Sequence, residues 1–313
     1  MSSAMAIETR DLTRSFGSKN AVRGLNLQVP SGSIYGFLGP NGAGKTTTIR
    51  LILGLIRPSS GSVFLNGREM TSRPHHEELR DVGALVETPA LYPNLTGREN
   101  LEVARRLLDV PFSRIDRVLA LMELSGDADR TVRSYSLGMR QRLGLALACL
   151  GDPRILILDE PSNGLDPEGV RDLRSLLRQI SSEGVTVFIS SHQLAEIDQI
   201  AEHIGILRQG ELIYQGRLQG LRKYSRELHL QVDDRTKATE CLKANGWSAW
   251  SDDDSSLRIT VHSEKDSASI ARLLVTRGVD VYDLHAPKPT LEDLFLQLLA
   301  NSEGEHAGLA PRH

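Results

Sequence analysis

An α/β fold is predicted by three apolar runs typical of buried strands, each combined with turn or helical patterns. The first run, residues 33–38, is followed by a glycine-rich loop and then by an apolar helical pattern at residues 46–56. The second run, residues 155–158, ends in two acids, and the third, residues 185–189, is rich in β-branched residues. Strands that alternate with helices in this way typically form a parallel sheet.

The loop after the first run matches the GxxxxGK[ST] pattern over Gly39–Thr47. Its glycines adopt backbone angles closed to other residues, so that successive N–H groups can surround a phosphate. A helix beginning at Lys45 would direct the positive end of its dipole at the same point. We expect Lys45 to reach the β- and γ-phosphates and the Thr46 hydroxyl to ligate Mg²⁺. The alternative, a glycine turn with a lysine in it, is disfavoured by the flanking strand and helix.

The second run ends at Asp159 and Glu160. Side chains alternate across a strand, so these two carboxylates are expected on different sides of its tip. Asp159 can then face a metal ion while Glu160 faces an attacking water, as hydrolysis of a γ-phosphate requires. The alternative is a strand that ends in solvated acids, and the phosphate loop elsewhere in the chain weighs against it.

Two further features are ambiguous when taken alone. Ser136 and Gly138 precede an apolar helical pattern, so this helix start is either a second anion site or a plain helix cap. His192 follows the third run. A histidine at a strand end is more often a surface or capping residue, but ligands bind at the carboxyl ends of parallel strands.

Together these motifs resemble the nucleotide-binding subunit of an ABC transporter, over roughly residues 7–220. The resemblance implies a P-loop NTPase fold with a RecA-like core and an N-terminal antiparallel β subdomain. It also implies a helical subdomain, which amphipathic runs place near residues 88–150. The whole nucleotide-binding domain is expected over residues 1–222.

By the same resemblance, Gly39–Thr47 is the Walker A loop and Asp159 the Walker B acid. Glu160 is implied as the catalytic base, and His192 as a histidine that contacts the γ-phosphate. Phe16 stands where the family stacks an aromatic ring on adenine; core packing is its alternative. The other residues implied in the site are Gly39, Pro40, Asn41, Gly42, Ala43, Gly44, Lys45, Thr46 and Thr47 for ATP, Ser136, Leu137, Gly138 and Met139 for the signature that contacts ATP in trans, Asp166 (within the D-loop of residues 163–166) and, for Mg²⁺, Thr46, Glu87 and Asp159.

The sequence departs from the family pattern at two positions. Leu137 replaces a signature glycine, but Ser136 and Gly138, which contact the γ-phosphate in the family, are kept. Glu87 stands where the family has glutamine; a carboxylate can still hold Mg²⁺ and water but adds a negative charge beside a triphosphate. The segment that begins at Glu87 is similar to bacitracin- and lantibiotic-type export and self-protection ATPases, which implies export of an antibiotic peptide, drug or similar compound.

The chain has one Walker A loop and one signature, whereas the family holds each ATP between two cassettes. The resemblance therefore implies a second copy of the chain or a paralogous cassette, together with a separate polytopic membrane permease subunit. The alternatives are a regulatory or sensory ABC ATPase with little hydrolysis, prompted by Glu87 and Leu137, and a soluble non-transport ABC protein.

Composition sets limits on the compartment and on the partners. The 313 residues carry a formal net charge of −3, which gives no bulk attraction to nucleic acid. There is no apolar run of membrane-spanning length, no signal-peptide pattern and no disulfide framework, since there are only two cysteines. A cytoplasmic protein is predicted, and the resemblance places it peripherally on the cytoplasmic face of the cell membrane.

The residue pattern changes after residue 221. Strand and helix patterns follow in the order βαββαβ over residues 227–284, which predicts a small C-terminal α+β domain at residues 223–313 with a ferredoxin-like arrangement. A final helix is expected at residues 290–299, and a frayed tail after it. The acidic residues 252–254 indicate a solvated turn, and His75 and His76 have no partner at metal-ligand spacing.

Overall fold

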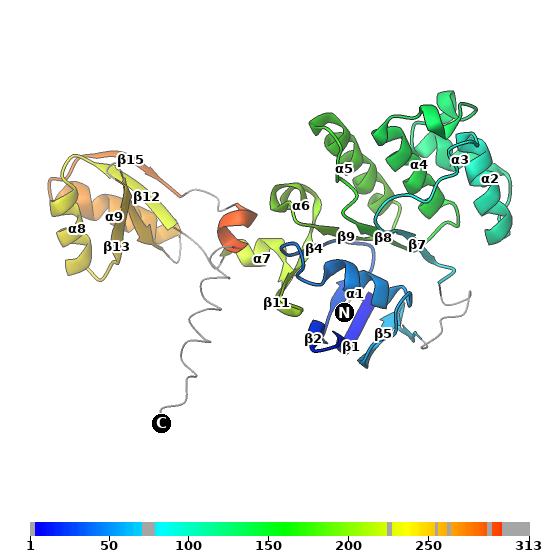
Figure 1. Cartoon of the computed structure of the whole chain (residues 1–313). Helices are drawn as coiled ribbons and strands as arrows, with labels where there is room; N and C mark the ends of the chain where they lie inside the picture. Colours follow the sequence, from blue (N-terminus) through cyan, green and yellow to red (C-terminus); the bar gives the residue numbers. More distant parts are fainter. Residues whose placement is uncertain are drawn as a thin grey trace. The chain divides into compact units, whose positions relative to one another are not determined.

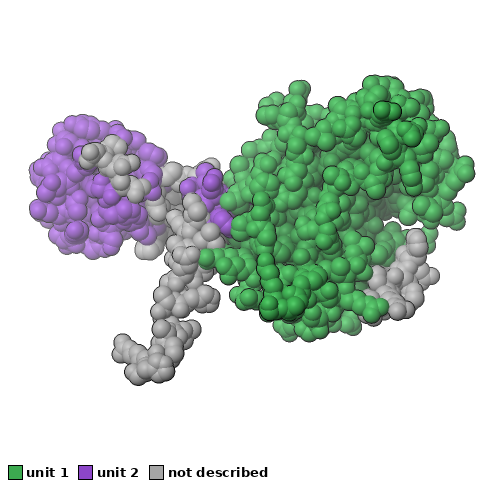
Figure 2. Space-filling view, viewed as in Figure 1, with its two compact units in different colours: residues 1–217 green, residues 218–313 purple. Residues whose placement is uncertain are grey.

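The computed structural model describes residues 4–70, 79–223, 227–253, 256–261, 264–286 and 290–295. The chain divides into two compact units, residues 1–217 and residues 218–313, which Figure 2 colours separately. Each unit has a hydrophobic core of its own. His75 and His76, part of the acidic turn and the C-terminal tail lie outside the described residues. No helix in the described part of the chain is long and apolar enough to cross a membrane.

A six-stranded sheet forms the centre of the first unit, in the order β11-β10-β4-β9-β8-β7 (Figure 1). Five of its strands are parallel neighbours, and β11 pairs antiparallel with β10 at one edge. All three sequence-predicted strand runs are confirmed, as β4, β8 and β9. The strands are β4 (Ile34–Leu38), β7 (Val82–Leu85), β8 (Ile155–Asp159), β9 (Thr186–Ser191), β10 (His203–Arg208) and β11 (Glu211–Arg217).

The two faces of this sheet pack against different layers. On one face, Tyr35, Phe37 and Phe188 join the core shared with α1 (Lys45–Ile52), and the rings of Tyr35 and Phe188 stack with centroids 5.6 Å apart. On the other face lie α5 (Pro167–Ser182) and α6 (Leu194–Ile200) (Figure 1). A Cβ atom at Gly36 would come within 2.2 Å of the Ile197 side chain, so glycine lets α6 approach the sheet closely. Because β4, β9 and β8 are parallel neighbours, their carboxyl ends lie at the same edge of the sheet.

An antiparallel sheet precedes and follows β4 in the sequence. Its main path is β2-β1-β5-β6, with β3 also paired to β1. Its apolar residues belong to the same core cluster as α1 and the central sheet, so the two sheets enclose α1 between them. The strands are β1 (Met5–Phe16), β2 (Lys19–Leu25), β3 (Gln28–Pro30), β5 (Ser60–Leu65) and β6 (Arg68–Glu69).

A group of helices is inserted between β7 and β8. Its first helix, α2, starts with a capping box in which Thr96 and Glu99 satisfy each other's backbone N–H groups. Leu101, Ile115 and Leu119 are buried where these helices pack together. The helices are α2 (Gly97–Leu108), α3 (Ser113–Leu121), the short 3₁₀ turns η1 (Ser125–Asp127) and η2 (Val132–Ser134), and α4 (Leu137–Cys149).

The second unit begins with the short helix α7 (Leu218–Lys223) and contains a four-stranded antiparallel sheet in the order β13-β14-β12-β15. Leu230 and Ile259 of this sheet are buried in one cluster with the helical residues Leu242 and Leu274. A helical turn at residues 291–295 lies within the predicted final helix. The remaining elements are β12 (Glu227–Val232), α8 (Arg235–Ala244), β13 (Ala249–Asp253), β14 (Ser256–Thr260), α9 (Glu264–Thr276) and β15 (Val281–His285).

Candidate nucleotide-binding site

The glycine loop joins β4 to α1 in a conformation that requires its glycines. Gly42 and Gly44 have φ angles of 79° and 111°, which side chains rarely tolerate. A Cβ atom at Gly39 would lie 2.4 Å from the carbonyl oxygen of Leu207, and one at Gly44 would lie 2.4 Å from that of Ala21. Among the described residues no side chain caps α1, which leaves its first N–H groups for an anion.

Lys45 folds back over this loop. Its side chain is 6% exposed, and Nζ donates a hydrogen bond to the carbonyl oxygen of Gly39 at 2.7 Å. The same ammonium lies 3.2 Å from Oε1 of Glu160, so it is compensated by a carboxylate. A buried cation held at a phosphate-binding loop is suited to contact an incoming polyphosphate.

Two acids lie at the tip of β8, and Ser190 forms a hydrogen bond with each of them. Asp159 is 2% exposed and accepts a hydrogen bond from Ser190 Oγ at 2.6 Å. The same hydroxyl oxygen accepts a hydrogen bond from the backbone N–H of Glu160 at 3.0 Å. Glu160 has a φ of 51°, a conformation that costs a non-glycine residue free energy and is often found at functional sites. Ser190, on the neighbouring strand β9, therefore orients both acids.

The Glu160 carboxylate also contacts His192, the histidine predicted from the sequence. Its Oε2 lies 2.5 Å from Nδ1 of His192, while its Oε1 faces Lys45. Three residues that are far apart in the sequence are thus brought together at the carboxyl edge of the sheet. The carboxylate lies between two nitrogen donors, an arrangement that holds it in one orientation.

A cavity of about 720 Å³ opens between this group and the N-terminal sheet, a volume that suits a nucleotide-sized ligand. Phe16 lines it with its side chain 51% exposed, which disfavours the core-packing alternative. The Arg14 guanidinium lies over the Phe16 ring, 4.5 Å from its centroid. Five of the lining residues were not predicted from the sequence: Lys19, Asn20, Ala21, Arg23 and Gln209. The cavity is lined by Phe16, Lys19, Asn20, Ala21, Arg23, Asn41, Gly42, Gly44, Lys45, Thr46, Thr47, Glu160, Asn163, His192 and Gln209.

A second cavity, of about 680 Å³, lies on the side of Thr46 that faces β7 and α4. The three sequence-predicted metal ligands, Thr46, Glu87 and Asp159, all line it, together with Glu160. One hydroxyl and two carboxylates are hard oxygen donors, so the donor types present suit Mg²⁺. Within the described residues no cluster of three or more His, Cys, Asp or Glu side chains is placed to hold a metal by itself.

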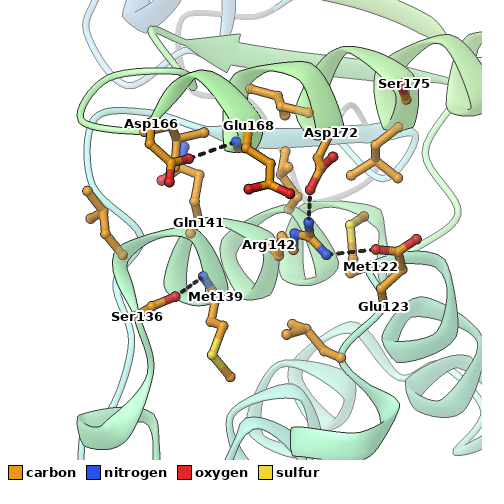
Figure 3. A pocket seen from close by; sticks show the side chains of 18 of the residues that line it. Met122, Glu123, Ser136, Met139, Gln141, Arg142, Asp166, Glu168, Asp172 and Ser175 are labelled. Carbon is orange, nitrogen blue, oxygen red and sulfur yellow. Dashed lines mark hydrogen bonds and ion pairs between the residues drawn. The ribbon is translucent and has the colours of Figure 1, made fainter.

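The signature residues lie elsewhere. Ser136 caps α4, its Oγ accepting from the Met139 N–H at 3.2 Å, and Asp166 caps α5, its Oδ1 accepting from the Gly169 N–H at 2.8 Å (Figure 3). These two helix starts line a cavity of about 670 Å³ that does not include the glycine loop. Of the four signature residues, only Leu137 also lines the second cavity, the one of about 680 Å³ beside Glu87 and Asp159.

Comparison with known proteins identifies the family. Residues 22–163 match the family model of the ABC transporter, and residues 216–299 match the family model described as ATP-binding protein DrrA1-3-like, C-terminal domain. The bacitracin transport ATP-binding protein BcrA of Bacillus licheniformis is 41% identical over 298 residues, which cover 94% of this chain and 97% of BcrA. The chain belongs to the ABC transporter ATP-binding proteins.

Other ABC relatives agree with this assignment. The lantibiotic transport ATP-binding protein SrtF of Streptococcus pyogenes is 39% identical over 214 residues, covering 68% of this chain and 92% of SrtF. A solved dimeric structure of the ATP-binding cassette MJ0796, in a post-hydrolysis state with ADP and Pi, superposes with a TM-score of 0.61 at 26% identity over 68% of this chain and 98% of that one.

The predicted resemblance to ABC ATPases, and to their bacitracin and lantibiotic type, is confirmed. As a member of this family the chain binds ATP, and it is an ATPase whose hydrolysis is coupled to transport. ABC cassettes as a class dimerise and act with membrane permeases.

Proposed function

We propose that this chain drives the export of a bacitracin- or lantibiotic-type compound, hydrolysing ATP with Glu160 as the general base. The observation that carries the proposal is the Glu160 carboxylate held between Lys45 and His192 at the rim of a nucleotide-sized cavity. The likeness to BcrA and SrtF, whose names state bacitracin and lantibiotic transport, supports the class of cargo.

The proposed sequence of events starts from the contacts of Lys45. When the triphosphate enters the glycine loop, Lys45 turns from the Gly39 carbonyl and from Glu160 to the phosphate oxygens. Glu160, relieved of its ammonium partner, then accepts a proton from the attacking water. His192 turns from Glu160 to the γ-phosphate, and Phe16 stacks on the adenine ring. Each residue exchanges a partner within the protein for the nucleotide.

Mg²⁺ is proposed as the cofactor, held by Thr46, Asp159 and Glu87, and it would neutralise phosphate charge during transfer. The Ser190 hydroxyl donates a hydrogen bond of 2.6 Å to the Asp159 carboxylate and holds it in one orientation. Thr46 lies in the first turn of α1, one residue after Lys45, which begins the helix. Contacts within the protein itself therefore hold these two residues in position.

A second cassette is proposed to complete each ATP site. Ser136 and Gly138 line a cavity that excludes the glycine loop, so the signature of one chain serves the loop of another. The dimeric MJ0796 structure supports a dimer of identical chains, and a paralogous cassette would satisfy the same geometry. A polytopic permease on the membrane would hold the pair at its cytoplasmic face.

A ferredoxin-like arrangement is proposed for the C-terminal domain. The strand order β13-β14-β12-β15, with both helices sharing one buried cluster with the sheet, supports it. We place the nucleotide-binding domain at residues 1–222 and the accessory domain at residues 223–313; the compact units divide slightly earlier, after residue 217.

The experiment is to purify the untagged chain with the membrane protein that accompanies it and to measure steady-state ATP hydrolysis with and without bacitracin or a lantibiotic. The proposal expects turnover that the exported compound changes. Tight ATP binding with turnover no higher than in the Glu160→Gln variant would favour the regulatory sensor instead.

A further inference from the structure

Glu87, the residue that departs from the family pattern, is paired with a cation on the helix after the glycine loop. Nη2 of Arg50 forms an ion pair and hydrogen bond with Oε1 of Glu87. Arg50 lies in the last turn of α1, four residues after Thr46. Residues at this spacing lie on the same face of a helix, with about 6 Å between their Cβ atoms. The pair therefore lies one helical turn from the hydroxyl proposed to ligate Mg²⁺.

The backbone of Glu87 favours this placement. Glu87 follows the end of β7 by two residues and has a φ of 61°, in the left-handed region. Its side chain is 61% exposed, yet it lines the same cavity as Thr46, Asp159 and Glu160. The carboxylate thus contacts the guanidinium of Arg50 and also lines the cavity that holds the proposed metal ligands Thr46 and Asp159.

The charges around the cavity make the guanidinium important. Asp159, Glu160 and Glu87 are three carboxylates that line one cavity, into which a triphosphate would bring more negative charge. Lys45 compensates Glu160, and Arg50 compensates Glu87. Arg133 and Arg140 line the cavity, whereas Arg50 reaches it through Glu87. Arg140 donates a hydrogen bond to the Tyr135 carbonyl oxygen at 2.6 Å.

We propose that Arg50 is a positioning residue that holds the Glu87 carboxylate and competes with the metal site for it. Glu87 leaves Arg50 only when MgATP is bound, so the pair sets the Mg²⁺ concentration at which ATP binds. This inference rests on the proposed function, in which Glu87 serves the metal. It gives a physical reason why this chain tolerates glutamate where the family has glutamine.

The test is a double-mutant cycle on the full-length, untagged chain. The variants are Arg50→Gln, Glu87→Gln and the double variant, with Arg50→Lys to keep the charge. Arg117→Gln, on an exposed ion pair with Glu183 away from the cavity, is the matched control. The measurement is binding of fluorescent ATP while Mg²⁺ is titrated from an EDTA-buffered start, which requires no hydrolysis.

In the Glu87-containing chain, Arg50→Gln should lower the Mg²⁺ concentration for half-maximal ATP binding by about two- to fivefold, the range of an exposed ion pair. Glu87→Gln should raise it, and in that background Arg50→Gln should have no effect. Arg50→Lys and Arg117→Gln should stay close to the unmodified chain.

An equal shift from Arg50→Gln in both backgrounds would show a general charge effect and overturn the inference, as would no shift at all. ATP binding that does not depend on Mg²⁺ would overturn it too. Failure of the proposed function is distinct, because it would appear as turnover that Glu160→Gln leaves unchanged.

Discussion

Nδ1 of His192 lies 2.5 Å from Oε2 of Glu160, so the histidine that follows β9 contacts the acid that follows Asp159 at the end of β8. Parallel pairing of β8 and β9 places Asp159 opposite Ser190, which brings the residues that follow each strand side by side. The contact orients Glu160 toward the cavity.

Replacement of the proposed base should separate binding from hydrolysis. Glu160→Gln keeps the size of the side chain but removes the group that accepts a proton, so steady-state ATP turnover should fall by about 10²-fold or more. ATP affinity should change little, and size-exclusion chromatography with MgATP should show a stable dimer. Glu183→Gln, on the exposed end of α5, is the control. Turnover equal to that of the unmodified chain would remove Glu160 from the role of base.

His192 should affect the rate more than the affinity. His192→Ala removes the donor that we propose turns from Glu160 to the γ-phosphate, and the loss of one such donor costs about 10²-fold or more in turnover. Single-turnover hydrolysis and ATP binding, measured on the same preparation, check this. His285→Ala in the second unit is the control. A variant that loses affinity and rate in equal proportion would instead place His192 in ground-state binding.

Ser190 should matter for both stability and the metal site. Ser190→Ala leaves the buried Asp159 carboxylate without its 2.6 Å hydrogen bond, and a lost bond to a buried group costs about 1–3 kcal/mol. We expect a lower urea midpoint and a higher Mg²⁺ requirement for hydrolysis. Ser182→Ala, at the end of α5, should change neither quantity. An unchanged midpoint in Ser190→Ala would show that this hydroxyl does not orient the acid.

The first unit should lose stability in mild acid through His203. Burial, with a smaller contribution from Arg217, lowers the pKa of this imidazole below its ordinary value. Above the ordinary pKa of about 6.5 the ring is neutral in both the folded and the unfolded chain. The contribution of the buried ring to the free energy of unfolding is then fully present. As the pH falls below this value, the unfolded chain binds the proton before the folded chain does. The contribution of His203 to the free energy of unfolding is therefore lost progressively as the pH falls through the lower, folded-state pKa.

Urea unfolding followed by circular dichroism at pH 7.5 and pH 5.5 checks this. His203→Gln should lose less stability between these two pH values than the unmodified chain. An identical loss in both proteins would show that another group governs the acid response.

The parts of the site that were predictable are those encoded in contiguous segments. The glycine loop has its whole chemistry within Gly39–Thr47, and the acidic strand carries Asp159 and Glu160 at its end. The shift from apolar runs to an alternating pattern after residue 221 likewise indicated a second α+β unit. Such local patterns determine which residues can approach a phosphate or a metal ion.

What could not be predicted depends on pairing between distant segments. Ser190 looks like any strand residue until β9 is known to pair with β8. The Arg50–Glu87 ion pair joins residues 37 positions apart, and the positive φ of Glu87 in the loop after β7 is not visible in the sequence pattern. The exposure of Phe16 depends on how the antiparallel sheet meets the loop, which periodicity does not reveal.

The most direct test of the central claim uses inside-out membrane vesicles from cells that carry either the unmodified gene or the Glu160→Gln allele. ATP-dependent accumulation of labelled bacitracin or a labelled lantibiotic is measured. The account predicts accumulation with the unmodified chain and none with Glu160→Gln. Equal accumulation in both, or no ATP-dependent accumulation of either compound with the unmodified chain, would contradict it.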